Sequence, residues 1–409
     1  MERVVITGMG AVTPVGNDVK TFWESLKAGK CGIGPITKFD ASEFKVKLAA
    51  EVKDFDVEQY IEKREARRMD ENCQFALAAA QQAVDQAGLK EGNFDPFRTG
   101  VIFGSGVGGL HVTEIEIPKL NEKGPGRVSP LCIPEMIANM AAAYISMRFG
   151  FKGENFAPVS ACATANHAIG EAMRAIRHGY QDIVVCGGTE NGIIPISMAG
   201  FQNMKAVHTG DDPACASVPF DARRSGFVMG EGAGCLVLES LSHAKARGAE
   251  ILAEVAGYGA SGDAYHITSP DPSGEAASRA ILGAITDAGL TPSDVDYVNA
   301  HGTSTPLNEK YETTALKKAF GDAAYKVKVS STKSMTGHLL GGAAAVEAVA
   351  CVMAIRDGVV PPTIGYKEPD PDCDLDITPN EAVKMPVNVA ISNSLGFGGH
   401  NATVLFKKV

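Results

Sequence analysis

Short sequence patterns occur twice in this chain of 409 residues, in the same order each time. Ala-Gly-Leu at 87–89 returns at 288–290, each time before a run rich in β-branched residues. Val-Ser at 159–160 returns at 329–330, and each is expected to open a helix, the first ending at Gly179 and the second at Gly358. Strands that end in glycines are expected after both helices. Such a repeat predicts a duplicated unit packed about a pseudo-twofold axis.

The segments inside the repeat alternate between two compositions. β-Branched runs at 4–7, 101–103 and 183–186 are typical of buried strands, and Ala-rich stretches at 70–87 and 162–178 are typical of helices. This alternation predicts an α/β fold. We expect one half to span residues 1–250 and the other 251–409, and we expect the site where strands end.

Composition excludes several classes of protein. With 45% hydrophobic and 21% charged residues the chain is not disordered. It has no apolar run of about 18 residues and no export signal at its start, so we expect a cytoplasmic protein that does not span a membrane. The net charge of −10 without a long basic run argues against nucleic acid. Nine cysteines without a CxxC pair indicate reduced thiols and no zinc site.

One of these cysteines has the setting of a nucleophile. Cys162 lies among small residues where a strand is expected to turn into a helix, and the free N–H groups of a helix start favour a thiolate. The alternative is a buried structural cysteine, which is the usual fate of a free thiol.

Two histidines have comparable settings. His301 and His338 are each flanked by glycine and hydroxyl residues after expected strands, unlike the other histidines singled out, which we interpret as structural: His111, His178, His208, His243 and His266. With Cys162 they suggest thiol catalysis assisted by two imidazoles. Lys333 could supply a fixed charge or be a plain surface lysine. Glu347, in an apolar helix, should need a cationic partner.

A glycine-rich loop near the end of the chain, 393–401, places Phe397 between glycines. Such a loop can present N–H groups to an oxyanion and can move, or it can simply be a turn with a packed phenylalanine.

Four blocks, VSACATANHA, NAHGTSTP, STKSMTGHLLGGAAAVE and NSLGFGGHN, resemble in order and spacing those of the β-ketoacyl-[acyl-carrier-protein] synthases, especially the type II condensing enzymes of bacterial fatty acid synthesis. The resemblance runs from VVITGMGAVTPVG to the last strand. It implies a thiolase-like duplicated αβαβα five-layer sandwich and a homodimer. The implied reaction condenses malonyl on acyl carrier protein with an acyl thioester, with loss of carbon dioxide.

The resemblance also implies roles for individual residues. Cys162 carries the acyl chain, His301 and His338 assist decarboxylation, and Lys333 and Glu347 support His338. The N–H groups of Cys162 and Phe397 form an oxyanion hole, and Phe397 is a gate. The substrate would be bound by Thr303 and Thr305 on the pantetheine arm and by Val107, Phe201 and the partner's segment 129–140 on the acyl chain. No metal or redox cofactor is implied, although a monovalent cation could lie near Asn299 and Asn393.

Acyl carrier protein is acidic, so a local basic patch must overcome the net charge of −10. The residues proposed for this patch are Lys63, Arg64, Arg67, Arg68 and Lys205, and helical spacing is expected to put Arg64, Arg67 and Arg68 near one face. The alternative is a solvated helix face.

The chain departs from the family at Gly341-Gly342-Ala343-Ala344, where Gly-Ala-Ala-Gly is typical, and at 193–198, which leaves the preferred acyl length open. A degradative thiolase should have a second cysteine in the 393–401 loop, which has none here. A coenzyme A-dependent starter enzyme should use Cys-His-Asn, whereas this chain has a second histidine, His301. A catalytically silent chain-length factor should lack the nucleophile. A polyketide or specialised-lipid synthase shares every motif and stays open.

Overall fold

The protein is described here by a computed structural model over residues 2–409. Its centre is a mixed sheet of ten strands in the order β10-β9-β13-β14-β8-β1-β7-β6-β4-β5. These strands are β1 Val4–Val12, β4 Thr99–Ser105, β5 Asn155–Phe156, β6 Ile183–Glu190, β7 Gly232–Ser240, β8 Ala253–Gly262, β9 Tyr297–Asn299, β10 Lys328–Ser330, β13 Val389–Gly396 and β14 His400–Lys407.

The strand order is the same in both halves of the chain. From the centre outward the first half runs β1-β7-β6-β4-β5 and the second runs β8-β14-β13-β9-β10. The first strands of the halves meet antiparallel, with Val5 opposite Glu254. The duplication expected from the sequence is therefore confirmed by the topology. We propose a division near residue 250, in the connection between β7 and β8.

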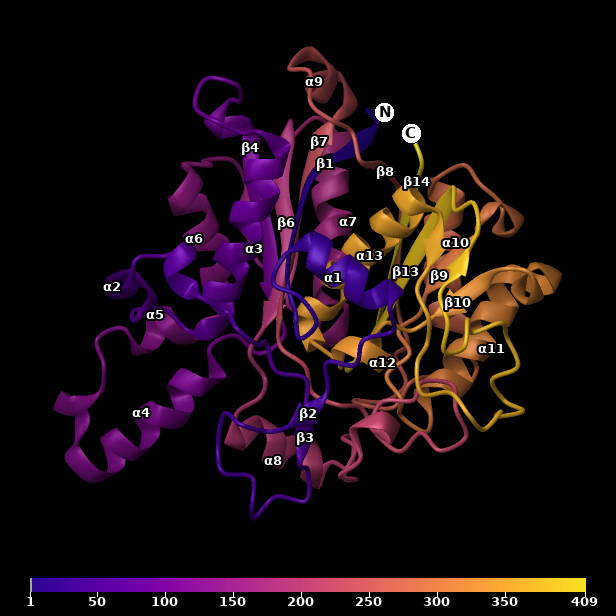
Figure 1. Ribbon diagram of the computed structural model, residues 1–409. Coiled ribbons are helices and arrows are strands. Elements are labelled where there is room, and N and C mark those ends of the chain that lie inside the picture. Colours follow the sequence, from indigo (N-terminus) through magenta and orange to yellow (C-terminus); the bar gives the residue numbers. More distant parts are fainter. Residues whose placement is uncertain (1) are drawn as a thin grey trace.

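Helices add three layers to the two halves of the sheet (Figure 1). Outer helices cover the first half, α3 Glu71–Ala87 and α6 Met140–Phe149, and the second half, α10 Glu275–Asp287 and α11 Asn308–Phe320. Between the halves lie α7 Thr164–Arg177 and α13 Ala343–Asp357, which pack on each other and on strands of both halves. This is the predicted αβαβα sandwich.

At two positions an outer helix packs directly against the backbone of a strand. A Cβ atom on Gly8 of β1 would lie 2.0 Å from the carbonyl oxygen of Ala83 in α3. In the second half a Cβ atom on Gly257 of β8 would lie 2.0 Å from the carbonyl oxygen of Ala284 in α10. Glycine is required at both positions because the helix backbone occupies the space of a side chain.

The expected helices and strands are largely confirmed, with one error. Val329 and Ser330 belong to strand β10 and do not open a helix, because the helix α13 that ends before Gly358 begins only at Ala343. The intervening segment makes a short helix that stops at Gly337, whose φ of +64° is incompatible with a continuing helix.

The remaining helices and strands lie outside these layers or at their margins. They are α1 Val19–Lys27, α2 Lys63–Ala66, α4 Leu110–Lys123, α5 Cys132–Met136, α8 Pro195–Asn203, α9 Leu241–Ala246, α12 Lys333–Thr336, β2 Gly34–Pro35, β3 Leu48–Ala49, β11 Val359–Val360 and β12 Val383–Lys384. Among residues 2–409, none of the helices combines the length and the apolar character needed to span a bilayer.

Candidate active site

Cys162 lies in a tight turn at the start of α7. The turn is a 3₁₀ helix at Ala161–Ala163, and Ala161 has a φ of +51°, which is strained for a residue with a side chain. The thiol is 7% exposed. The strand-to-helix elbow expected from the sequence therefore places the sulfur at the N-terminal end of a central helix, where it faces the second half of the fold.

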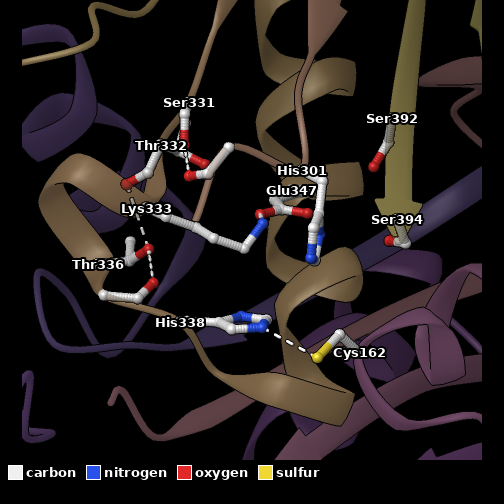
Figure 2. Close-up of polar contacts among 12 residues, drawn as sticks. Cys162, His301, Ser331, Thr332, Lys333, Thr336, His338, Glu347, Ser392 and Ser394 are labelled. Atoms are coloured by element: carbon white, nitrogen blue, oxygen red, sulfur yellow. Dashed lines mark hydrogen bonds and ion pairs between the residues drawn. The ribbon is translucent and has the colours of Figure 1, made fainter. Parts of the chain in front are cut away.

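His338 contacts the thiol directly (Figure 2). Its Nε2 atom lies 3.0 Å from the Sγ atom of Cys162. Two backbone hydrogen bonds hold the histidine: its N–H donates to the carbonyl of Val228 over 2.8 Å, and its carbonyl accepts from Gly230 over 2.9 Å. The backbone of His338 is thus held by the first half of the chain although the residue belongs to the second.

His301 is the second imidazole at the sulfur. Its ring centroid lies 5.3 Å from that of His338 in an edge-to-face arrangement, and reactive atoms of both rings and of Cys162 lie within 4.8 Å of one another. The turn that carries it is held by Glu312 of α11, which accepts from the N–H of His301 at 2.7 Å and of Gly302 at 2.9 Å. Sequence analysis did not identify Glu312, since a lone glutamate in a helix carries no distinguishing signal.

Lys333 and Glu347 form a buried ion pair next to the histidines (Figure 2). Lys333 is 1% exposed, so it is not a surface lysine. Glu347 contacts Lys333 and no hydrogen bond joins it to His338 within residues 2–409. It therefore acts on the imidazoles only through the lysine.

Burial and the Lys333 charge determine the protonation of the site. Both lower the pKa of His338 well below its usual range, and they do the same to the pKa of His301, which His338 lowers further. Burial raises the pKa of the Cys162 thiol to about 12, a rise that Lys333 opposes. The resting site therefore holds a thiol and two neutral imidazoles.

The glycine loop after β13 packs against the Cys162 turn. A Cβ atom on Gly396 would lie 2.7 Å from the carbonyl oxygen of Ser160, so the approach needs glycine. The N–H groups of Phe397 and of Cys162 itself both face the thiol and lower its pKa. An oxygen on a carbon bonded to this sulfur would have both donors in reach.

A cavity of about 510 Å³ opens onto the thiol and both imidazoles. Five residues that the sequence analysis assigned to substrate or carrier line it, namely Val107, Phe201, Lys205, Thr303 and Thr305. The atypical segment 193–198 contributes Ile193 and Met198 to the buried apolar cluster that contains Cys162.

Phe227 is a cavity residue that sequence analysis missed. Its ring packs edge-on against His338 at 5.4 Å and against Phe201 at 5.3 Å. It lies in the run PFDARRSGFVMGEGAG, where an aromatic residue between glycine and β-branched residues looks like an ordinary core position.

The basic residues assigned to the carrier have different settings in the structure. Lys205 lines the cavity, whereas the residues of the 63–68 segment do not. Helix α2 ends at Ala66, so Arg67 and Arg68 follow the helix rather than share its face as expected. Arg64, Arg67 and Arg68 are exposed, and Lys63 pairs with Glu58 at 2.9 Å.

A sandwich of duplicated halves with a thiol and two neutral imidazoles in the wall of one cavity defines a thiol-dependent acyl-transfer enzyme. Comparisons with known proteins agree with this class. The family described as "Beta-ketoacyl synthase, N-terminal domain" matches residues 1–244, and "Beta-ketoacyl synthase, C-terminal domain" matches 252–367. The chain belongs to the beta-ketoacyl synthase family.

Individual relatives are similar over their whole length. The chain is 52% identical to the 3-oxoacyl-[acyl-carrier-protein] synthase 2 of Synechocystis sp. over 408 residues, covering 100% of this chain and 98% of that protein. It is 52% identical to the enzyme of the same name from Staphylococcus aureus over 407 residues, with the same coverage.

Solved structures also match over the full length. A beta-ketoacyl synthase from Burkholderia phymatum has a TM-score of 0.93 at 34% identity and full coverage of both chains. A type II polyketide ketosynthase, solved in complex with its acyl-carrier protein, has a TM-score of 0.93 at 34% identity, covering 100% of this chain and 99% of that one.

Proposed function

We propose that this protein is a 3-oxoacyl-[acyl-carrier-protein] synthase that elongates fatty acyl chains by two carbons. It takes an acyl group onto Cys162 as a thioester and condenses it with malonyl carried on acyl carrier protein. The observation that carries this proposal is the contact between the Cys162 thiol and the neutral imidazole of His338, beside a second neutral imidazole, at the end of the cavity.

The first half-reaction is a thioester exchange. The thiol gives its proton to Nε2 of His338 as Sγ attacks the acyl carbonyl carbon, and the oxyanion accepts hydrogen bonds from the N–H groups of Cys162 and Phe397. Collapse of this intermediate breaks the bond to the carrier's sulfur. The carrier thiolate takes the proton and leaves, so Cys162 holds the acyl group.

The second half-reaction forms the carbon–carbon bond. Malonyl loses carbon dioxide, and the electron pair of the broken bond becomes an enolate whose oxygen accepts hydrogen bonds from His301 and His338. A neutral imidazole has one N–H to donate, so His338 donates from the tautomer that carries its proton on Nε2, and burial strengthens these bonds. The enolate carbon attacks the acyl carbonyl, the bond to Sγ breaks, and the Cys162 thiolate is released with the β-ketoacyl product on the carrier.

The remaining polar residues would position the substrate. The hydroxyls of Thr303 and Thr305 lie 3.0 Å apart on the cavity wall, where they can bind the pantetheine arm. Phe397 follows Gly396 and precedes Gly398, so it can swing as a gate without steric strain in the adjoining residues.

We assign acyl carrier protein as the macromolecular substrate and a second copy of this chain as the partner. The edge strand β5 is exposed, and large apolar side chains are exposed near it along the chain: Ile133, Met147, Phe156 and Val159. An exposed apolar sheet edge favours pairing with another copy. Nine free cysteines favour a reducing cytoplasm.

A monovalent cation would fit beside the site. Asn299 on β9 is paired in register with Ser392 on β13, next to Asn393. Buried oxygen atoms there lack hydrogen-bond partners, including Oδ1 of Asn299 and Oε2 of Glu347. Oxygen ligands of this kind suit a hard cation. When bound, the ion would stabilise the loops that carry His301 and Phe397.

The test is elongation by the purified protein given malonyl-acyl carrier protein and a ladder of acyl-carrier substrates, with products read by intact mass. Products two carbons longer than each substrate support the proposal. Acylation of Cys162 without elongation would point to a specialised synthase that needs another extender or carrier. Absence of acylation would refute the assignment.

A further inference from the structure

Glu190 is a buried carboxylate at the C-terminal end of β6, beside the cavity but outside the reacting group. Its side chain is fully shielded from solvent. Oε2 accepts from the N–H groups of Gly106 over 2.8 Å and Gly341 over 3.0 Å. Oε1 accepts from the hydroxyl of Ser105 over 2.6 Å and from the N–H of Val107 over 3.3 Å.

These four donors come from two segments in different halves of the chain, the end of strand β4 with the loop that follows it and the loop at Gly341. Gly106 and Val107 follow strand β4, and Val107 lines the cavity. Gly341 follows the turn that carries His338. The loops touch so closely that a Cβ atom on Gly341 would lie 2.3 Å from the nitrogen of Gly106. The Glu190 carboxylate therefore connects the Val107 loop, which forms part of the cavity wall, to the turn that carries His338.

The ionised form of Glu190 matches its surroundings. All four partners donate to the ionised carboxylate; a proton on Oε2 would face two N–H groups, and a proton on Oε1 would require the Ser105 hydroxyl to turn and accept. Burial raises the pKa of Glu190 to about 7, although the donors oppose this rise. At about pH 8 the group is ionised and accepts all four hydrogen bonds.

We propose that Glu190 is a positioning residue that sets which acyl chains Cys162 accepts, because its carboxylate holds the Val107 loop in place against the His338 turn. The inference rests on the proposed function and names a determinant of its substrate range. His338 is held independently, by Val228 and Gly230. Weakening the hydrogen bond between Val107 and Glu190 should therefore move the cavity wall more than it moves the imidazole of His338.

Glu190→Gln tests this relation with little change in shape. The amide oxygen can keep the bonds to Gly106 and Gly341, while the amide NH₂ group then faces Ser105 and Val107. The Ser105 hydroxyl can turn to accept, but the N–H of Val107 is left facing a donor. The perturbation is thus directed to the residue that lines the cavity. Ser105→Ala weakens the same oxygen's contacts without introducing an amide, and serves if Glu190→Gln does not fold.

Glu51→Gln is the matched control. Glu51 is also a buried carboxylate that accepts from a backbone N–H, that of Thr37 over 2.7 Å, and from the hydroxyl of the same residue over 2.6 Å. It is not among the residues that line the cavity. A general cost of replacing a buried carboxylate by an amide will therefore appear in both variants.

The experiment measures single-turnover acylation of Cys162 at about pH 8 from acyl-carrier substrates of increasing length, read by intact mass. We expect the ratio of long-chain to short-chain rates to change by about fivefold in Glu190→Gln, the size of one lost hydrogen bond, and in the same direction in Ser105→Ala. Glu51→Gln should keep the wild-type ratio.

Three outcomes would overturn the inference: an unchanged ratio in both site variants, an equal change in Glu51→Gln, or a uniform loss for every chain length. Absence of acylation in the wild type would instead refute the proposed function, and it would be seen before any variant is compared.

Discussion

The Sγ atom of Cys162 and the Nε2 atom of His338 lie 3.0 Å apart although 176 residues separate them in the chain. Cys162 belongs to the first half of the duplicated fold and His338 to the second. Each half thus supplies a different part of one site, because the central helices α7 and α13 pack against each other between the two half-sheets. The two halves of the duplicated fold have the same strand order but supply different catalytic residues.

Removal of the Cys162 sulfur should stop condensation while leaving the decarboxylation machinery in place. We expect Cys162→Ala to lower elongation by about 10³-fold or more, because no acyl-enzyme can form. Cys162→Gln should retain loss of carbon dioxide from malonyl-acyl carrier protein, since His301 and His338 are untouched. Intact-mass analysis of the carrier separates the two activities, and elongation by either variant would contradict the assignment of the nucleophile.

Decarboxylation should not depend on protonation of the histidines near neutral pH. The pKa values of His301 and His338 are lowered well below 6.5 by burial and by Lys333, so acid far below neutrality is needed to charge either ring. We therefore expect the decarboxylation rate of Cys162→Gln to stay level from about pH 8 to about pH 6. A fall centred near pH 6.5 would mean that an imidazole titrates normally and that the neutral description is wrong.

Much of this site was predictable because turns after strands carry recognisable residues. Cys162, His301, His338 and Phe397 each stand among glycines or small residues, and the structure brings all four to one cavity. The fold class was predictable because the internal repeat and the alternation of β-branched and Ala-rich segments survive in the sequence. The site residues could be found in this way because the constraint is local: tight turns need small residues wherever the backbone is closely packed.

Other contacts within the site were not predictable in the same way. Glu312 and Phe227 look ordinary in sequence, and their roles arise from neighbours brought close only by folding. The error at Val329 has a related cause. Strand β10 and helix α13 follow each other in the expected order, but the turn that carries His338 lies between them. The first half has no turn of equal length at the corresponding place.

The buried pair of Lys333 and Glu347 should be costly to break on one side only. Glu347→Gln leaves an ammonium group in the core without its counter-charge, and we expect a loss of about 3–5 kcal/mol in the free energy of unfolding. The double variant Lys333→Met with Glu347→Gln should recover much of this stability but not decarboxylation. Urea denaturation measures the first effect. A single variant as stable as the wild type would show that the charges are not desolvated together.

Charge reversal at Arg67 and Arg68 tests their proposed contact with acyl carrier protein. Both are exposed, so replacement by glutamate should leave the melting temperature nearly unchanged. We expect the KM for malonyl-acyl carrier protein to rise by about tenfold with little change in kcat, and the effect to shrink with added salt. Arg279→Glu is the control, because Arg279 is exposed on α10 in the other half. An unchanged KM, or an equal rise in the control, would remove these arginines from the docking surface.

Gly396→Ala should damage catalysis more than stability. The added Cβ atom would lie 2.7 Å from the carbonyl oxygen of Ser160, so the loop must retreat from the Cys162 turn and carry the N–H of Phe397 with it. Loss of one oxyanion donor lowers kcat by about a hundredfold, and we expect a decrease of that size in acylation of Cys162.

The matched control for Gly396→Ala is Gly200→Ala in helix α8, where a Cβ atom meets nothing within 4 Å. Alanine there should raise the free energy of unfolding by about 0.5–1 kcal/mol and leave acylation unchanged, because it only replaces a flexible helix residue. Should Gly396→Ala acylate at the wild-type rate, the Phe397 N–H would not be an oxyanion donor. The hole would then depend on the Cys162 N–H alone, and the close approach of the two turns would serve packing rather than chemistry.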